Sequence, residues 1–311
     1  MQHRQLGSSG LTVSVVGLGT NQFRTKMDDA TVNDTVSAAL DAGVTLFDTA
    51  DVYGNRGGSE ESLGLALRGQ REHAVVATKF GLDMQDGAVA RGSRRYIRTS
   101  IEGSLRRLQT DWIDLYQYHA PDHVTPIEET LAALDELVDE GKVRYIGSSN
   151  FTAWQVVDAE WTARTAHRER FVSAQNRYNL LERDVERELT PAAVRCGVGI
   201  LPWFPLAAGA LTGKYRRGEP PPPGTRLAGS PIAGRMLTDA TYALVERLEV
   251  FAGERGHSML EVAIAGLASR PAVGSVIAGA TSPEQVRANA AAGDWVLSDE
   301  DLAALDAALH S

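Results

Sequence analysis

Four residues that can hold or move protons lie at the ends of short apolar runs in this chain. Asp48 and Tyr53 close one run and the turn after it, Lys79 closes a second run, and His119 closes a third. A free tyrosine has a pKa of about 10 and is a poor acid near neutral pH. A neighbouring ammonium group favours the phenolate, so we expect Lys79 to lower the pKa of Tyr53. The combination predicts a tuned phenolic proton donor.

The other two residues complete a coherent chemistry. Asp48 would pair with Lys79 and keep it charged and oriented, while His119 would donate a hydrogen bond to a substrate oxygen or to the proton relay. A positioned phenol can protonate the oxygen of a carbonyl group while a hydride reaches its carbon. Because the polypeptide supplies no hydride, this site requires a nicotinamide cofactor. Any one of the four residues alone is more often a salt bridge or a helix cap, so the prediction depends on the set.

Eight apolar runs rich in β-branched residues, each followed by a polar turn and most by a segment of helical period, must position these groups. Eight such units in one series predict a closed parallel (β/α)8 barrel, the TIM barrel, as a single domain over residues 1–311. Reacting groups of such barrels lie at the C-terminal ends of strands, so the four residues should share one rim. The predicted strands cover residues 13–19, 44–50, 74–80, 112–119, 143–149, 171–176, 198–204 and 274–280.

Several segments add to the simple repeat. Residues before Val13 predict a short N-terminal β-hairpin that turns around Gly7-Ser8-Ser9-Gly10. Thr125-Pro126-Ile127-Glu128 predicts a helix start with a capping threonine, a first-turn proline and a capping-box glutamate, and Ser282-Pro283-Glu284-Gln285 predicts another of the same kind. A long insertion separates the seventh strand from the eighth. Its run Pro220–Pro223 is interpreted as a stiff surface loop rather than a polyproline ligand.

The composition and charge of the chain disfavour several classes of protein, including nucleic-acid-binding and membrane proteins. Hydrophobic residues make up 43% and charged residues 23%, which is typical of soluble globular domains. The net charge of −9 disfavours nucleic acid as a partner. The N-terminus has no apolar signal-peptide core, and the longest uncharged stretch, 196–213, contains two prolines, so we expect no membrane partner and a cytoplasmic location. The single cysteine, Cys196, excludes an intramolecular disulfide and is interpreted as a packing residue.

No metal site is predicted. His119 and His123 have a spacing that can bind zinc on a helix, but Pro121 lies between them and His119 ends a strand. Asp111 and Asp114, at the start of the fourth strand, are interpreted as structural.

Three segments resemble the aldo-keto reductase family, and the resemblance runs along essentially the whole chain. They are Phe47-Asp48-Thr49-Ala50-Asp51-Val52-Tyr53-Gly54, Ala77-Thr78-Lys79 and Asp114-Leu115-Tyr116-Gln117-Tyr118-His119. The branch that it resembles holds bacterial aldo-keto reductases and potassium-channel β subunits. The resemblance implies a catalytic tetrad of Asp48, Tyr53, Lys79 and His119 that reduces aldehydes or ketones to alcohols, with Tyr53 as the general acid.

The resemblance also implies a cofactor site. Ser149, Asn150 and Gln175 would hold the nicotinamide carboxamide, and Lys214 and Arg226 would meet the phosphates. The full set comprises Thr20, Asn21, Asp48, Ser149, Asn150, Gln175, Trp203, Leu206, Lys214, Arg226, Gly279, Thr281, Gln285 and Asn289. Many relatives grip the 2′-phosphate of NADP with a lysine and an arginine where this chain has Gly279 and Gln285. The channel-subunit branch is similarly uncharged there and uses NADP, so NADPH is expected first, with NADH possible.

The substrate would be a small carbonyl compound held by Tyr53 and His119 against an apolar wall of Phe23, Phe80 and Trp203, although the two phenylalanines could equally belong to the core. Oligomeric state stays open. Two other functions remain in view. One is a nicotinamide-binding regulatory subunit that senses redox state and turns over little. The other is a lyase or aldolase that uses Lys79 as a Schiff-base amine, which leaves Tyr53 and the carboxamide-binding set unexplained.

Overall fold

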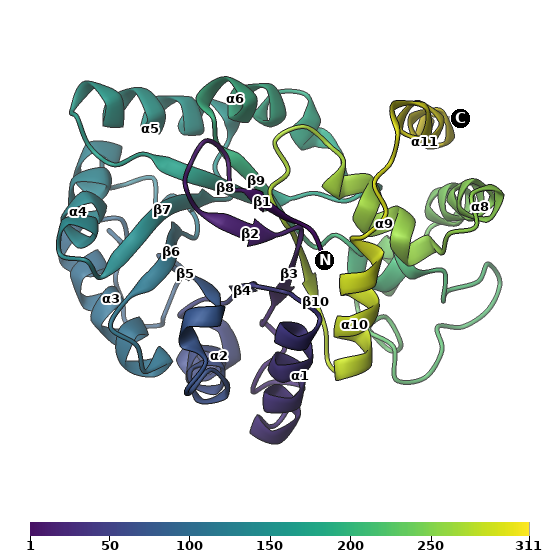
Figure 1. Ribbon diagram of the computed structural model, residues 1–311, viewed down its shortest axis with the longest axis horizontal. Coiled ribbons are helices and arrows are strands. Elements are labelled where there is room, and N and C mark those ends of the chain that lie inside the picture. Colours follow the sequence, from purple (N-terminus) through teal and green to yellow (C-terminus); the bar gives the residue numbers. More distant parts are fainter. Residues whose placement is uncertain (311) are drawn as a thin grey trace.

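The computed structural model describes residues 1–310, which form a closed barrel of eight parallel strands (Figure 1). The strands pair in the order β10-β3-β4-β5-β6-β7-β8-β9. Each lies within one of the eight predicted runs, except that β8 extends one residue further, so the predicted barrel is confirmed. The strands are β3 Val16–Gly19, β4 Leu46–Asp48, β5 Val75–Phe80, β6 Ile113–Tyr118, β7 Val143–Ser149, β8 Phe171–Arg177, β9 Gly199–Trp203 and β10 Val276–Gly279.

Helices surround the barrel and bury the outer face of its sheet (Figure 1), as a parallel sheet requires. The α-helices are α1 Asp29–Asp41, α2 Tyr53–Ala66, α3 Arg94–Leu108, α4 Ile127–Asp139, α5 Ala153–Thr165, α6 Leu189–Cys196, α7 Ala233–Met236, α8 Asp239–Glu254, α9 Met259–Ala268, α10 Pro283–Ala292 and α11 Asp299–His310. Short 3-10 turns cover Arg71–His73 (η1), Asp184–Glu186 (η2) and Ala207–Thr212 (η3). Cys196 is buried at the end of α6, in the core.

The predicted N-terminal hairpin is present and lies across one end of the barrel (Figure 1). It consists of β1 His3–Gln5 and β2 Thr12–Ser14, paired antiparallel. The predicted strand over residues 13–19 is therefore too long, because its first two residues belong to the hairpin. Gly7 in the turn has a φ of 59°, and a Cβ there would lie 2.4 Å from the carbonyl oxygen of Gly197. Only glycine allows the hairpin to approach the barrel this closely.

The two predicted helix starts differ in outcome. Ser282 caps α10 as expected, since its Oγ accepts a hydrogen bond from the backbone N–H of Gln285. The predicted capping role of Thr125 is wrong, because α4 has Pro126 at its cap position and no side chain bonded there. Asp122 explains the difference, since its carboxylate accepts hydrogen bonds from both the backbone N–H and the hydroxyl of Thr125. The threonine hydroxyl is thus engaged in the loop that precedes the helix.

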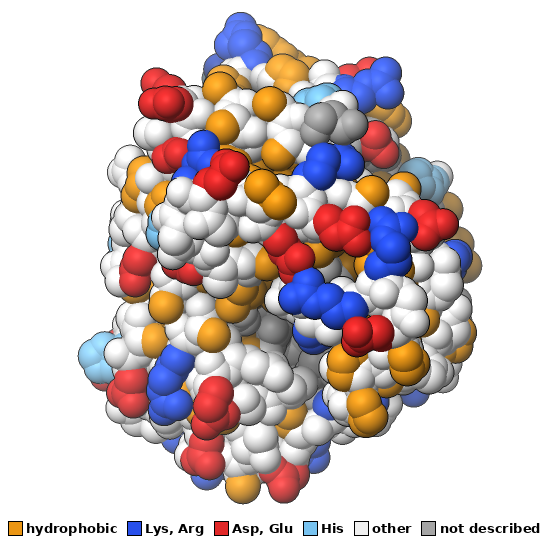
Figure 2. All heavy atoms as spheres, turned by 90° about the vertical axis from the view of Figure 1, so that its right-hand side faces the viewer, with side chains coloured by type: hydrophobic (Ala, Val, Ile, Leu, Met, Phe, Trp, Pro, Cys, Tyr) orange, Lys and Arg blue, Asp and Glu red, His pale blue; other side chains and the backbone are white. Residues whose placement is uncertain are grey.

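The insertion between β9 and β10 contains η3, α7, α8 and α9. Pro220, Pro222 and Pro223 are exposed in it, as expected for a surface loop. Figure 2 shows acidic and basic side chains interspersed on the face that includes this insertion. In the part of the chain from residue 1 to 310, no helix is long and apolar enough to cross a membrane.

Candidate active site

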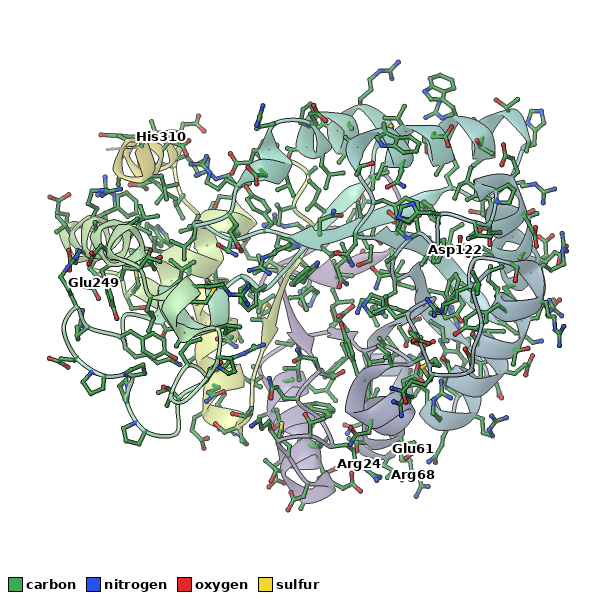
Figure 3. All side chains as sticks on the ribbon, turned by 180° about the vertical axis from the view of Figure 1, so that it is seen from behind. Arg24, Glu61, Arg68, Asp122, Glu249 and His310 are labelled. Atoms are coloured by element: carbon green, nitrogen blue, oxygen red, sulfur yellow. The ribbon has the colours of Figure 1, made fainter. Side chains whose placement is uncertain are left out.

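Strand register brings the predicted polar residues to one end of the barrel. Asp48 is paired with Ala77, two residues before Lys79 on β5, and Lys79 is paired with Gln117 on β6. On the far side of the barrel, Ser149 of β7 is paired with Gln175 of β8. Because side chains alternate along a strand, residues at these positions project into the barrel or around its rim. Figure 3 shows this end of the barrel, with Asp122 on the side of α3 and α4 and Glu249 opposite, in the insertion.

A buried ion pair forms the centre of the site. Lys79 Nζ lies 2.7 Å from Asp48 Oδ2 and donates a second hydrogen bond, 2.8 Å long, to the carbonyl oxygen of Thr49. Asp48 Oδ1 accepts hydrogen bonds from the amides of Gln175, at 2.7 Å, and Gln117, at 3.3 Å. Burial alone would lower the pKa of Lys79, but Asp48 and then Tyr53 outweigh it, so that pKa is raised. Lys79 therefore stays an ammonium ion inside the barrel.

Tyr53, the first residue of α2, lies over this pair. Lys79 Nζ is 5.0 Å from the centroid of the Tyr53 ring. Burial, helped by the charges of Asp48 and Asp51, raises the pKa of Tyr53 above its usual value, and the ammonium of Lys79 only opposes this rise. The predicted effect of Lys79, which is to lower this pKa, is present, but burial and the two carboxylates outweigh it, so the pKa of Tyr53 is raised overall. In this state the phenol stays protonated at neutral pH.

His119 lies beside Tyr53, with the two rings edge to face and their centroids 5.7 Å apart. Its backbone N–H donates to the carbonyl oxygen of Phe80, which holds the residue just beyond β6. Burial, and then the charge of Lys79, holds the pKa of His119 well below its usual range, so the imidazole is neutral. Its Nδ1 is buried without a hydrogen-bond partner among the described residues. A neutral imidazole carries one N–H that can donate to a substrate oxygen.

The predicted carboxamide-binding residues form a connected group next to His119. Asn150 Nδ2 donates to the carbonyl oxygen of His119, at 2.9 Å, and to Ser149 Oγ, at 3.1 Å. Trp203 Nε1 donates to Asn150 Oδ1 at 3.2 Å. Asn150 adopts a left-handed φ of 58°, which asparagine tolerates better than most residues. Together with Gln175, which bonds Asp48, these side chains line one side of the tetrad.

Thr20 and Leu206 lie in the protein framework around this group. Thr20 is fully buried, and its hydroxyl bonds to the backbone of Asp48 and to Ser59 Oγ. Leu206 is half-buried and packs against the core after β9. Asn21 is exposed at the end of β3, with its Oδ1 close to Gly279 of the neighbouring strand β10.

Two more groups of predicted cofactor contacts lie around the rim. Gln285 Oε1 accepts a hydrogen bond from the Thr281 N–H, and Asn289 Nδ2 donates to the Gly279 carbonyl, which ties β10 to the N-terminus of α10. Lys214 and Arg226 are exposed on the insertion.

The insertion adjoins the site through aromatic rings. The guanidinium of Arg226 lies 5.6 Å from the ring centroid of Phe204, and this ring contacts Trp203. Among residues 1–310, neither Lys214 nor Arg226 has a carboxylate within ion-pair distance. Lys214 Nζ lies 5.4 Å from the centroid of the Tyr215 ring, within the insertion. Cations without a carboxylate partner can bind phosphate groups.

The predicted substrate residues separate into two sets. Tyr53, His119 and Trp203 lie at the rim of the barrel, as described above. Phe23 and Phe80 are fully buried in the main core, where Phe80 stacks on Tyr118 with ring centroids 5.1 Å apart. In this structure the two phenylalanines present no surface to a bound molecule.

Two residues around the site were not predicted from the sequence. They are Gln117, whose amide donates to Asp48, and Asp51, which is buried two residues before Tyr53. The alternation of side chains along β6 could have indicated Gln117, since Gln117 and His119 are two residues apart and share a face.

Among the described residues, no group of three histidines, cysteines or acidic residues is placed to hold a metal ion. His119 is buried, whereas His123 is exposed.

Comparison with known proteins identifies the family of the chain. The model of the aldo/keto reductase family matches residues 15–310. A probable voltage-gated potassium channel subunit beta of Oryza sativa subsp. japonica is 38% identical over 304 residues, covering 95% of this chain and 92% of that protein. An uncharacterized oxidoreductase of Bacillus subtilis, YrpG, is 39% identical, with 92% of this chain and 89% of that protein covered. The L-glyceraldehyde 3-phosphate reductase of Escherichia coli (strain K12) is 34% identical, with 98% and 92% covered. The chain therefore belongs to the aldo/keto reductase family.

Proposed function

We propose that the protein is an NADPH-dependent oxidoreductase that reduces small aldehydes or ketones to alcohols, with Tyr53 as the general acid. The observation that carries this proposal is the arrangement of a protonated phenol over a buried ammonium–carboxylate pair, beside a neutral imidazole. Each group has the protonation state that its role requires. Relatives named as reductases support the same class of reaction.

Each residue of the site has a separate role in carbonyl reduction. When bound, the nicotinamide supplies a hydride to the carbonyl carbon. Tyr53 Oη donates its proton to the carbonyl oxygen, so that the product is a neutral alcohol. Lys79 stabilises the phenolate that remains, and Asp48 keeps Lys79 charged in a buried place. His119 donates a hydrogen bond to the same oxygen and orients the substrate.

Several features of the chain fit the cofactor. Asn150 and Ser149 offer amide and hydroxyl groups next to His119, and the half-buried Trp203 offers an indole face. The unpaired cations Lys214 and Arg226 would meet the phosphates. The backbone at the N-terminus of α10 can also receive phosphate, because helix N-termini present free N–H groups.

We expect Arg226→Gln to weaken NADPH binding about tenfold, because a charge-assisted contact to phosphate is lost. Arg217→Gln is the matched control, since Arg217 lies in the same insertion but is paired with Glu246 and Asp239. Nucleotide fluorescence titration at fixed ionic strength measures both variants. Equal affinities for the two variants would contradict a phosphate contact at Arg226.

The proposal is tested by following the oxidation of NADPH, and separately of NADH, against a panel of aldehydes and diketones. We expect steady turnover, faster with NADPH. The likeness to a probable channel β subunit favours a second candidate, a nicotinamide-binding regulatory subunit that senses redox state. Nucleotide binding without turnover on any substrate would favour that candidate. A protein that binds neither nucleotide would contradict both functions.

A further inference from the structure

Asp51 is a buried acid directly behind the catalytic residues. It lies between β4 and α2, two residues before Tyr53, and only 2% of its surface is exposed. Its backbone N–H donates to the carbonyl oxygen of Lys79 at 3.1 Å, and this bond holds Asp51 against β5. The exposed part of Asp51 lines a cavity of about 550 Å³ between α3 and the segment 84–90, which we call the α3 pocket. Water in this pocket can therefore reach the residue.

The surroundings of Asp51 leave its carboxyl group without a fixed counter-ion. Arg107, on α3, lines the α3 pocket, but its Nε donates to Glu60 at 2.6 Å. The other oxygen of Glu60, which is fully buried, accepts from the hydroxyl of Thr78 at 2.5 Å. Asp51 Oδ1 is buried with no hydrogen-bond partner among the described residues. One guanidinium thus faces two buried carboxyl groups and bonds to only one of them.

Charged and titratable groups surround Asp51 on α2, α3, β5 and β6, and Asp86, Arg95 and Arg106 also line the α3 pocket. Glu60 lies on α2, Arg107 and Tyr96 on α3, Lys79 on β5, and Tyr116 on β6. The hydroxyl of Tyr116 is also buried without a partner. Burial first, and then Glu60, raises the pKa of Asp51 to about 7, against the opposing charges of Arg107 and Lys79. The Asp51 carboxyl group therefore takes up a proton near neutral pH.

We propose that Asp51 is a positioning residue for carbonyl reduction, whose carboxyl group exchanges a proton with water in the α3 pocket and thereby adjusts the acidity of Tyr53. The inference depends on the proposed function. A negative Asp51 raises the pKa of Tyr53, in opposition to Lys79, which lowers it. When Asp51 takes a proton from water, this negative charge disappears and the phenol becomes a better acid. Reduction is then favoured below about pH 7 and slowed above it.

The first test is the pH dependence of hydride transfer in single-turnover experiments with the full chain. In the wild type we expect the rate to fall across an inflection near pH 7. Asp51→Asn should lose this inflection. Above pH 7 its rate should exceed that of the wild type, on the order of threefold for each unit by which the pKa of Tyr53 falls. Asp86→Asn is the matched control, because Asp86 is an exposed acid on the same pocket. An inflection that persists in Asp51→Asn, or disappears in Asp86→Asn, would overturn the proposal.

A second test needs no activity. In protein labelled with ¹³C at the aspartate carboxyl groups, NMR should show one resonance that titrates near pH 7. Labelled Tyr53 reports the coupling, since its ring resonance should titrate at lower pH in Asp51→Asn. The absence of any aspartate resonance with a pKa above about 5 in the wild type would overturn the inference, even if the variant failed to fold. Failure of the proposed reductase function would instead appear as absent turnover with these titrations intact.

Discussion

Replacing Tyr53 with phenylalanine should lower the rate of NADPH-dependent carbonyl reduction by about 10²- to 10⁴-fold, the range that a positioned general acid contributes. The substitution keeps the ring that packs edge to face on His119 and removes only the proton that the carbonyl oxygen must receive. Nucleotide affinity should change little, because the residues assigned to the nucleotide lie elsewhere around the rim. The loss should therefore appear in kcat rather than in the dissociation constant of NADPH.

Tyr145→Phe is a suitable control for this measurement. Tyr145 packs with the cluster beneath the N-terminal hairpin, at the opposite end of the barrel, so its variant loses a phenolic hydroxyl without touching the site. Single-turnover rates and nucleotide titrations on both variants separate chemistry from binding. A Tyr53→Phe variant that keeps more than about a tenth of the rate would show that another group supplies the proton.

The barrel and the composition of its rim could be predicted because both depend on local pattern. Runs of β-branched residues mark the strands, and the polar residues that end them must lie at one rim once the barrel closes. The limit of local pattern is visible at Ser14. Its Oγ bonds to the backbone of Val16 and of Thr45, so the chain bends there and the run divides between hairpin and barrel. Such a contact between distant segments has no signal in the local sequence.

The electrostatics of the site could be predicted only in part. The sign of the effect of Lys79 on Tyr53 follows from charge alone, whereas the net pKa depends on how deeply the phenol is buried. Nothing in the local sequence distinguishes Asp51 from an ordinary acidic residue of a loop, and only tertiary packing places it beside Glu60. Phe80 illustrates the same limit, because an aromatic residue at a strand end is equally compatible with a pocket wall and with the core.

Variants of the buried pair Asp48–Lys79 should distinguish effects on stability from effects on catalysis more clearly than variants of any other part of the site. Neither side chain is more than 4% exposed, and each charge compensates the other. Lys79→Met leaves an uncompensated carboxylate, and Asp48→Asn leaves an uncompensated ammonium. Each single variant should therefore lose roughly 3–5 kcal/mol in the free energy of unfolding, measured by urea denaturation. Each should also lose most of its activity, because Lys79→Met removes the ammonium beside Tyr53 and Asp48→Asn removes the carboxylate that holds this ammonium in place.

The double variant Asp48→Asn/Lys79→Met decides between structural and catalytic roles of the pair. It removes both charges together, so most of the lost stability should return, as is often found when a buried ion pair is replaced by neutral groups. Activity should not return with it, because no cation remains to stabilise the phenolate of Tyr53. Recovery of both stability and rate would show that the pair serves only to hold the barrel together. Recovery of stability alone would show that the pair contributes to catalysis apart from its contribution to stability.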